Sequence, residues 1–377
     1  MGVLQLVLII SGTLYVIYAV IAKYIWHQSQ SQLSQEKELL PLSIIILARD
    51  EEDNIQATLR SIQSCQYPPD LYEVILVDDH STDQTVEKAM SLDFFALKII
   101  RLEDYDLTNF GQLYKRAGLY YAIQEAQHAH ILQMDGDCIC QPTWIESMQC
   151  RLHDADVVIG PIDISKPRPS FIQLWQTYES IGTMVSTYIG YHFRLWYSGA
   201  SANMAYRKEV YLSYIQDHQV EVASGDDIFM IQDAQRKGSR VVFASSEDAI
   251  VTTAPVSTIS ELVRQRLRWA SKTRFYKSFG LTFFLILMAI FHWMIVTGVI
   301  IAFVLGSVPL LTVALCLIGL KWLGDWIIIG GTARFFGHRY QIWTSPFMSL
   351  VHTLYVCFIS VRSLFVREYD WKGRQVR

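Results

Sequence analysis

Long apolar runs at both ends of the chain constrain its fold more than any other feature. Val3–Ala22 is uninterrupted and is long enough to cross a bilayer once, which takes about 20 apolar residues. Phe279–Gly306 and Pro309–Gly331 are two further runs of this length, separated by a short uncharged turn at Ser307. So short a turn predicts a helical hairpin, which returns the chain to the side from which it came. The residues between the first and second runs must then fold outside the bilayer.

The last apolar run, Pro346–Val366, leaves two interpretations open. It is long enough to span a bilayer. Polar residues recur along it at near-helical spacing, however, and such a face is typical of a helix that lies in the interface. These residues are Ser345, Ser349, His352, Ser360 and Ser363. A crossing would place the basic tail outside, so we favour an interfacial or re-entrant helix.

Basic residues next to these runs indicate their orientation. They are Lys23, His27 and Lys37 after the first run, and Arg334, His338 and Arg339 after the hairpin. Since positive residues gather on cytosolic flanks, we expect both flanks to be cytosolic and the N-terminus to lie outside. A cleaved signal peptide would carry basic residues before its apolar run, whereas the first basic residue here is Lys23. We therefore expect an uncleaved anchor.

The charge of the chain is divided unevenly. Residues 262–377 contain 14 Lys and Arg against 3 Asp and Glu, whereas the first 261 residues contain 18 against 33. A basic, apolar end joined to an acidic body favours contact with anionic lipid head groups. Because the basic residues alternate with runs of membrane length, the pattern argues against nucleic acid as a partner.

From residue 42 onward, strand-like and helix-like segments alternate. The expected strands are 42–48, 73–77, 96–102, 130–134 and 157–160. One expected helix begins at Ile55, and three others cover residues 84–90, 115–126 and 143–152. Short, continuous apolar strands that alternate with helices predict an α/β fold, with a mostly parallel sheet covered by helices on both faces. Ligands of such sheets bind beyond the carboxyl ends of the strands.

Acidic clusters stand at those predicted strand ends. They are Asp50-Glu51-Glu52, Asp78-Asp79 and Asp135-Gly136-Asp137, and Asp226-Asp227 opens a later helix. An Asp-x-Asp pair supplies the hard oxygen ligands that Mg²⁺ or Mn²⁺ prefers, and the phosphates of a nucleoside diphosphate would complete the coordination shell. A further carboxylate could remove a proton from an acceptor hydroxyl as general base. These clusters therefore predict transfer of a sugar from a nucleoside diphosphate.

A further motif, Gln265-Arg266-Leu267-Arg268-Trp269, precedes the second apolar run. Arg268 could bind diphosphate oxygens with both guanidinium nitrogens, and Trp269 could form part of an acceptor wall. Each motif also has a structural explanation. Asp83 suits a helix cap, Asp-Gly-Asp suits a tight turn, and a basic helix suits a membrane surface. Their joint order is more specific than any one of them.

That order resembles the membrane-integrated family 2 glycosyltransferases, which have a GT-A catalytic fold and a D, D, D, QxxRW signature. The resemblance covers roughly residues 40–277. It implies a donor-binding group, a metal pair and a catalytic group. The donor-binding residues would be Ala48, Glu51, Asp78, Asp79, Lys115 and Asp135. Asp135 and Asp137 would bind Mg²⁺ or Mn²⁺, with Asp137 the more direct ligand. The catalytic residues would be Asp227 as base, with Gln265, Arg268 and Trp269.

The chain departs from the family pattern in places. Lys115 stands in a blurred version of the usual GKxxAL frame, His80 replaces the customary glycine after the first aspartates, and Asp226 replaces the usual glutamate before the base. None of these changes removes a needed functional group. The loop 197–204 resembles the family's small-residue loop beneath the acceptor. The aromatic stretch 171–196 is either ordinary core or, as we favour, a set of amphipathic helices at the bilayer surface.

Together these features predict a GT-A, Rossmann-like domain with terminal transmembrane or interfacial helices. We expect an N-terminal anchor at 1–26, the GT-A domain at 40–255, the QxxRW interfacial helix at 256–278, and a C-terminal membrane region with a basic tail at 279–377. The expected reaction is inverting transfer from a nucleotide-sugar, favouring UDP-sugar, to a lipid acceptor on the cytosolic face of the cell membrane.

Two other functions compete with transfer of a sugar to a lipid. The first is a processive polysaccharide synthase of the cellulose, chitin or poly-N-acetylglucosamine type, for which three or four crossings are few. The second is a membrane protein without this activity, either a transporter or a catalytically dead scaffold. Charge within the membrane would support a transporter, whereas the intact aspartate motifs and QxxRW argue against a dead enzyme. Between residues 279 and 331 the charged residues are Lys321 and Asp325, four apart on one helical face, and an ordinary ion pair would explain them.

Overall fold

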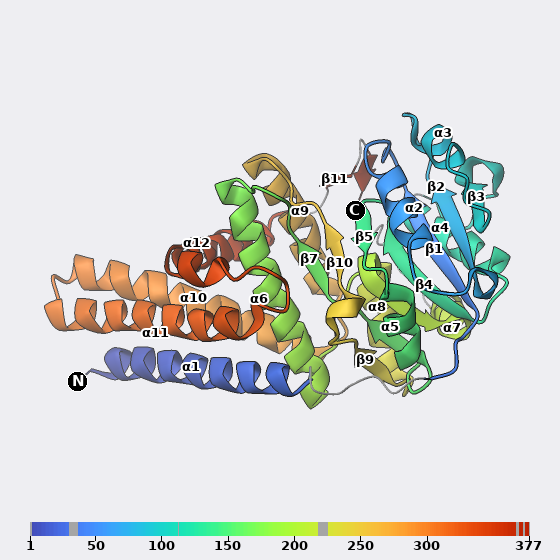
Figure 1. Ribbon diagram of the computed structural model, residues 1–377. Helices are drawn as coiled ribbons and strands as arrows, with labels where there is room; N and C mark the ends of the chain where they lie inside the picture. The colour runs from blue at the N-terminus through green and yellow to red at the C-terminus, as the bar shows by residue number, and fades with distance from the viewer. Residues whose placement is uncertain are drawn as a thin grey trace. The chain divides into compact units, whose positions relative to one another are not determined.

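The computed structural model describes residues 2–29, 37–111, 113–217, 225–366, 369–371 and 374–376. The chain divides into two compact units. The helical unit comprises residues 1–32, 165–196 and 255–367, and the sheet unit comprises residues 33–164, 197–254 and 368–377. Each unit is therefore built from segments that are far apart in the sequence (Figure 1).

The sheet unit is built on a mostly parallel sheet. Among the described residues its seven strands have the order β3-β2-β1-β4-β8-β6-β9. The strands are β1 (Leu42–Ala48), β2 (Tyr72–Asp78), β3 (Leu97–Arg101), β4 (His130–Asp135), β6 (Val157–Ile159), β8 (Met204–Arg207) and β9 (Val241–Phe243). β8 pairs antiparallel with β4 and β6, and the other pairs are parallel. The predicted α/β class is confirmed.

Helices and a small second sheet complete this unit. The helices are α2 (Ile55–Gln63), α3 (Thr85–Met90), α4 (Tyr114–Glu125), α5 (Trp144–Leu152), α7 (Lys208–Asp217) and α8 (Asp226–Arg236). α4 packs against β1 and β2, where a Cβ on Gly118 would lie 3.1 Å from Val77. The small sheet has the order β5 (Cys138–Cys140), β10 (Val251–Thr253), β7 (Ile162–Ile164), and a hairpin is formed by β11 (Tyr369–Trp371) and β12 (Arg374–Val376).

The register of the central strands gathers the polar clusters at one edge. β1 and β2 are mostly apolar, and all but one of their residues are buried, as expected for central strands of a parallel sheet. Ala48 pairs with Asp78, and Leu47 pairs with Asp135. Because these strands are parallel, the acidic residues that follow them emerge at the same edge of the sheet.

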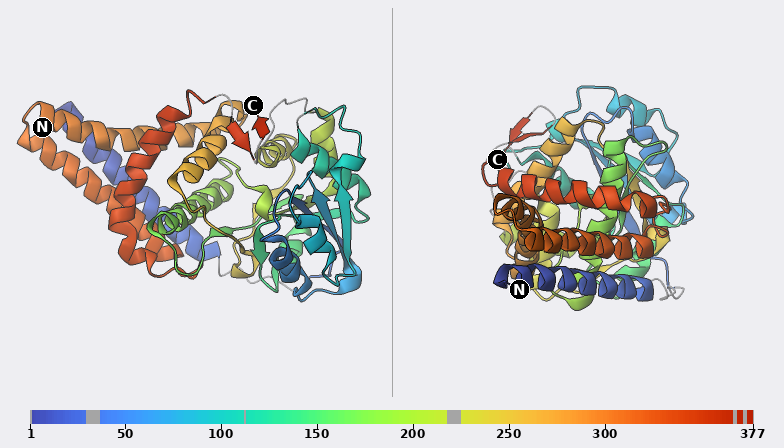
Figure 2. Two further views of the ribbon diagram at one scale, coloured as in Figure 1. Left: turned by 90° about the horizontal axis from the view of Figure 1, so that it is seen from above. Right: turned by 90° about the vertical axis from the view of Figure 1, so that its left-hand side faces the viewer.

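The helical unit contains α1 (Val3–Ser29), α6 (Phe171–Phe193), α9 (Ile259–Ser271), α10 (Phe279–Val304), α11 (Val308–Thr332) and α12 (Gln341–Arg362). Of the described helices, α1, α10, α11 and α12 are long and apolar enough to cross a membrane. α1, α10 and α11 run side by side (Figure 2). The stretch 171–196 is largely one helix, α6, and it packs against α1, α11 and α12.

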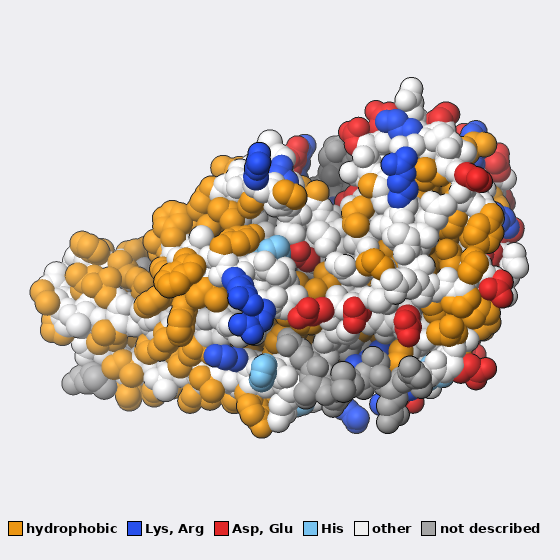
Figure 3. Space-filling model, in the orientation of Figure 1, with side chains coloured by type: hydrophobic (Ala, Val, Ile, Leu, Met, Phe, Trp, Pro, Cys, Tyr) orange, Lys and Arg blue, Asp and Glu red, His pale blue; other side chains and the backbone are white. Residues whose placement is uncertain are grey.

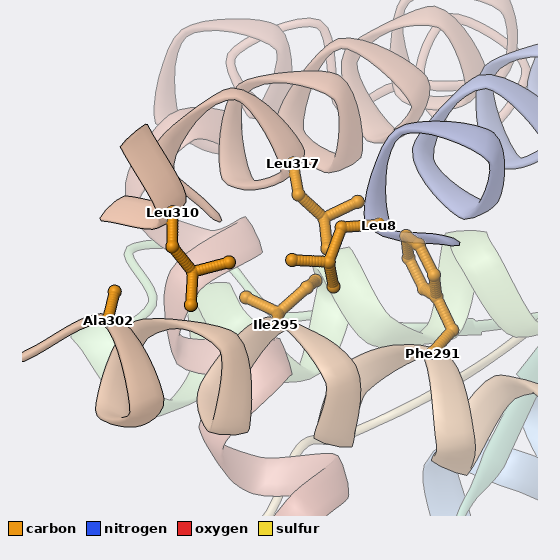
Figure 4. Close-up of a cluster of buried hydrophobic side chains, with 6 residues drawn as sticks. All are labelled: Leu8, Phe291, Ile295, Ala302, Leu310 and Leu317. Atoms are coloured by element: carbon orange, nitrogen blue, oxygen red, sulfur yellow. The ribbon is translucent and has the colours of Figure 1, made fainter. Parts of the chain in front are cut away.

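A small apolar core joins α1, α10 and α11. It contains Leu8, Phe291, Ile295, Ala302, Leu310 and Leu317 (Figure 4). α1 approaches α11 closely at Gly12, where a Cβ would lie 2.7 Å from Leu320. Such small residues let membrane helices pack tightly. Hydrophobic side chains also cover the outer surface of these helices (Figure 3), as expected for segments surrounded by lipid rather than water.

One ion pair inside this unit is buried among its helices. Lys321 and Asp325 of α11 form an ion pair and are 2% and 6% exposed. The hydroxyls of Tyr15 from α1 and Tyr178 from α6 each donate a hydrogen bond of 2.5 Å to Asp325. Lys321 also donates to the carbonyl of Ser349 in α12 at 3.0 Å. The predicted ordinary pair is confirmed, and it ties four helices together.

Candidate functional site

The first cluster of the site lies where β2 ends. Asp78 and Asp79 are buried, and the side chain of Asp78 accepts a hydrogen bond from the backbone amide of Ser81 at 3.2 Å. Asp79 is 3.0 Å from Nδ1 of His80, while Arg49 donates to the Asp79 carbonyl at 2.9 Å. His80 has a φ of 57°, the left-handed conformation that glycine adopts most easily. This backbone geometry explains why glycine is customary at the position of His80.

The end of β1 meets this cluster and the next one. The backbone amide of Asp79 donates to the carbonyl of Ala48 at 2.9 Å. A Cβ on Gly136 would lie 3.1 Å from the Ala48 side chain, so the Asp-Gly-Asp turn passes directly over the strand end. Glu51 accepts a hydrogen bond from Asn54 at 2.8 Å, and its own amide donates to Thr85 at 2.8 Å. Ala48 and Glu51 thus border both acidic clusters.

Asp83 has the structural role that its sequence suggests. Its carboxylate accepts hydrogen bonds of 3.0 Å from the backbone amides of Thr85 and Glu52. These bonds fix the start of α3 to the loop after β1. Asp83 thus anchors the start of α3, although the N-cap position itself is Gln84, whose side chain makes no capping bond.

The Asp-Gly-Asp turn joins β4 to β5. Thr253 of β10 donates a hydrogen bond of 3.2 Å to Asp137, because Thr253 pairs with Cys138 in the small sheet. Burial raises the pKa of Asp137, and the nearby carboxylates of Asp135 and Glu51 raise it further. Carboxylates brought together in this way repel one another unless a cation lies among them.

This donor set fits a divalent cation that substrate would help to hold. Within the described part of the chain, no group of three or more His, Cys, Asp and Glu side chains could bind a metal by itself. Asp135 and Asp137 supply hard carboxylate oxygens, and Mg²⁺ and Mn²⁺ commonly take their remaining ligands from water and substrate phosphates. The residues present therefore suit a metal that binds together with a phosphorylated substrate.

Lys115 and Ser201 connect the Asp-Gly-Asp turn to the predicted base. Nζ of Lys115 lies 3.7 Å from Asp135 and donates to the Ser201 hydroxyl at 2.7 Å. That hydroxyl donates to Asp135 at 3.2 Å, and the backbone amide of Ser201 donates to Asp227 at 3.1 Å. One serine thus contacts a carboxylate from each of two clusters that are 92 residues apart in the sequence.

Sequence reasoning left Ser201 and Thr253 out of the site. Ser201 belongs to the loop 197–204, which resembles the family's small-residue loop. The resemblance identifies the loop but gives Ser201 itself no role. Asn203 holds this loop in place with hydrogen bonds of 2.8 Å to the carbonyls of Pro161 and Ala249. Thr253 carries no local signal, because its contact with Asp137 depends on the pairing of two distant strands.

The QxxRW motif belongs to the helical unit, on α9. The helix starts with a capping box formed by Thr258 and Glu261. Gln265, Arg268 and Trp269 are spaced three and four residues apart and share one side of the helix. Trp269 remains 39% exposed. In the sheet unit, the predicted residues Ala48, Glu51, Asp78, Asp79, Lys115, Asp135, Asp137 and Asp227 gather at the strand ends and the loops beside them.

Two curated proteins with similar sequences are a glycosyltransferase and a galacturonate synthase by name. The chain is 26% identical to glycosyltransferase AglE of Haloferax volcanii over 239 residues, which is 60% of this chain and 71% of AglE. It is 32% identical over 127 residues to dodecaprenyl-phosphate galacturonate synthase of Rhizobium johnstonii, covering 32% of this chain and 36% of that protein.

A solved structure supports the fold. The mannosyltransferase PcManGT of Pyrobaculum calidifontis, solved with GDP-Man and Mn²⁺, aligns with a TM-score of 0.54 at 15% identity and covers 96% of this chain and 98% of its own. The predicted GT-A fold is confirmed. Residues 41–272 match the family described as glycosyltransferase like family 2, and the chain therefore belongs to that family of glycosyltransferases.

Proposed function

We propose that this glycosyltransferase is membrane-bound and transfers one sugar, with inversion, from a nucleotide-sugar to a lipid acceptor. The observation that carries the proposal is the Lys115–Ser201 bridge, which joins Asp135 of the acidic turn to Asp227. These contacts support a nucleoside diphosphate site that would lie beside the candidate base. The candidate membrane spans in the same chain favour an acceptor dissolved in the bilayer.

The donor side uses the first two strand ends and the acidic turn. Ala48, Glu51, Asp78 and Asp79 would bind the nucleoside, and Lys115 would bind the diphosphate. Asp137, with Asp135, would hold Mg²⁺ or Mn²⁺, which supplies positive charge to offset the charge on the leaving diphosphate. We favour UDP-sugar as the donor. The GDP-Man bound to PcManGT makes a GDP-sugar the alternative to test.

Asp227 is the candidate base for the acceptor, and the family resemblance assigns the QxxRW residues to the same reaction. For a hydroxyl acceptor, Asp227 takes the proton while the acceptor oxygen forms a bond to the anomeric carbon. The bond from that carbon to the diphosphate breaks, and the nucleoside diphosphate leaves with the electron pair. For a lipid phosphate, the attacking oxygen is already largely ionised near pH 7, so Asp227 would orient it rather than remove a proton. Gln265, Arg268 and Trp269 would complete this side.

We favour a polyprenyl phosphate among the lipid acceptors. The relative from Rhizobium johnstonii is by name a dodecaprenyl-phosphate galacturonate synthase, and it supports this choice. The catalytic domain (40–255) and the QxxRW helix (256–278) would face the cytosol at the cell membrane, between the anchor (1–26) and the C-terminal region (279–377). Basic residues near the end of α1 and after α11 support that orientation.

A processive polysaccharide synthase is the second candidate, and one assay separates the two. The purified protein in detergent receives radiolabelled UDP-sugars or GDP-sugars, Mn²⁺ and total membrane lipid. We expect label in the organic phase, on a lipid that carries one sugar. Label in long, water-soluble polymer would contradict the lipid acceptor and favour the synthase. No transfer of label with any of these donors would contradict the proposed function itself.

A further inference from the structure

Arg266 lies inside the QxxRW motif but is not one of its signature residues. Unlike its neighbours on α9, Arg264 and Trp269, it is buried, with 2% of its side chain exposed. Its Nε donates to both carboxylate oxygens of Glu179 in α6, at 2.9 and 3.2 Å, and Nη2 lies 2.5 Å from one of them. Two nitrogens along one edge of the guanidinium are thus bound to a second helix.

The rest of the guanidinium contacts the signature residues themselves. Nη1 donates to the side-chain carbonyl of Gln265 at 2.5 Å. The Cζ atom of Arg266 lies 4.2 Å from the centre of the Trp269 ring, which is a cation–π contact. Arg266 therefore contacts the residues that begin and end the motif, Gln265 and Trp269, while Glu179 holds it.

The charge of Arg266 is maintained in spite of its burial. Burial alone opposes the charged form, but Glu179 and Tyr355 of α12 outweigh it and raise the pKa of Arg266. A planar guanidinium can bind a carboxylate with two nitrogens and still stack on an aromatic ring, which a lysine ammonium cannot do. This geometry explains the need for arginine, and not merely for a positive charge, at position 266.

We infer that Arg266 and Glu179 are positioning residues that fix Gln265 and Trp269 in the orientation needed at the acceptor side. The inference rests on the proposed function. If Arg266 served only to fasten α9 to α6, a loss would affect the whole protein, including donor binding. A positioning role instead predicts a loss confined to acceptor use and turnover, since small misplacements of reacting groups cost rate.

The main test compares Arg266→Lys with Arg264→Lys, an exposed arginine two residues earlier on the same helix. Transfer is measured against total membrane lipid, and binding of UDP with Mn²⁺ is measured separately by calorimetry. We expect Arg266→Lys to reduce kcat, or raise the half-saturating lipid concentration, by about tenfold or more. UDP affinity should stay within about twofold, and Arg264→Lys should match the wild type in both assays.

Glu179→Gln provides a second variant that keeps the shape of the side chain and removes its charge. It should reproduce the loss seen with Arg266→Lys, again with UDP affinity retained. Normal transfer by both variants would overturn the inference. Loss of UDP binding together with transfer in both would also overturn it, because the pair would then support the whole structure. A wild type that binds UDP but transfers no sugar would contradict the proposed function instead.

Discussion

Arg116 of α4 and Asp226 of α8 form a buried ion pair, with Nε and Nη2 of the arginine 2.7 and 2.5 Å from one carboxylate oxygen. The Tyr214 hydroxyl donates to the same oxygen at 3.0 Å. The two adjacent aspartates at the start of α8 thus have different surroundings. Asp226 is 4% exposed and binds Arg116, whereas Asp227 is half-buried and contacts Ser201. The first aspartate holds the helix, and the second lies toward the site.

This division gives the first prediction. Arg116→Met should destabilise the protein by about 3–5 kcal/mol, because it leaves the Asp226 carboxylate buried without its cation. The double variant Arg116→Met/Asp226→Leu should recover most of that stability, since no unpaired charge remains. Thermal unfolding in detergent measures both. Equal stability of the single and double variants would contradict this prediction, because the unpaired Asp226 carboxylate would then not lower the free energy of unfolding.

The second prediction concerns Asp227. Asp227→Asn keeps the shape of the side chain and should leave UDP binding nearly unchanged. With a hydroxyl acceptor, turnover should fall by roughly 10²–10⁴, because the variant cannot accept a proton. With a polyprenyl phosphate the fall should be much smaller. Single-turnover rates with each acceptor distinguish these cases. Loss of UDP binding with normal turnover at saturating donor would assign Asp227 to the donor site.

The third prediction concerns the metal. Asp137 shares its surroundings with Asp135 and Glu51, so a cation should be needed before an anionic diphosphate can bind. Excess chelator should abolish transfer, and Mn²⁺ or Mg²⁺ should restore it. Asp137→Asn should weaken UDP binding in the presence of Mn²⁺ far more than in its absence, as calorimetry can measure. Full turnover in excess chelator would contradict the assignment.

The buried pair of the helical unit gives the fourth prediction. Asp325→Ala leaves Lys321 without its carboxylate and removes the acceptor of Tyr15 and Tyr178, so the protein should lose about 3–5 kcal/mol of stability. Lys321→Met/Asp325→Leu should be much less harmful, since it removes both charges. Unfolding in detergent tests this, with Lys166→Met as an exposed control in the same unit. Transport activity need not be invoked for a pair that four helices enclose.

Much of the fold could be predicted because its signals are local. β1 is the run Leu42–Ala48 at both ends as predicted, and β2 and β4 extend one residue or less beyond the expected strands at each end. A buried parallel strand needs only a short apolar run, and the acidic residues after it mark the strand end. The membrane-length helices followed from length and composition alone.

The parts that could not be predicted depend on distant contacts. β8 (Met204–Arg207) is four residues long, and its antiparallel pairing with β4 and β6 leaves no period in the sequence. Ser201 and Thr253 contact Asp135 and Asp137, which are 66 and 116 residues away in the sequence. Only the folded sheet brings these residues together. Likewise, nothing local to Asp226 indicates that Arg116 is its partner.

The fifth prediction concerns the side of the membrane on which the chain ends. α12 is apolar enough to span, and its polar residues Ser345 and Ser349 are buried against the helical unit, with 0% and 3% exposure. Because these polar residues are buried by protein, they no longer indicate that this side of α12 faces water. The strands Tyr369–Trp371 and Arg374–Val376, however, belong to the same compact unit as the sheet that carries the site.

A tail that folds with the sheet unit must lie on the same side of the bilayer as that unit. Basic residues follow α11 and recur in the tail, so a full crossing by α12 would put these two basic stretches on opposite sides of the membrane. We therefore expect a reporter fused after Arg377 to be cytosolic, and a reporter placed in the α10–α11 turn at Ser307 to be external. An external reading after Arg377, with the Ser307 control unchanged, would make α12 a true crossing and would contradict the interfacial or re-entrant helix.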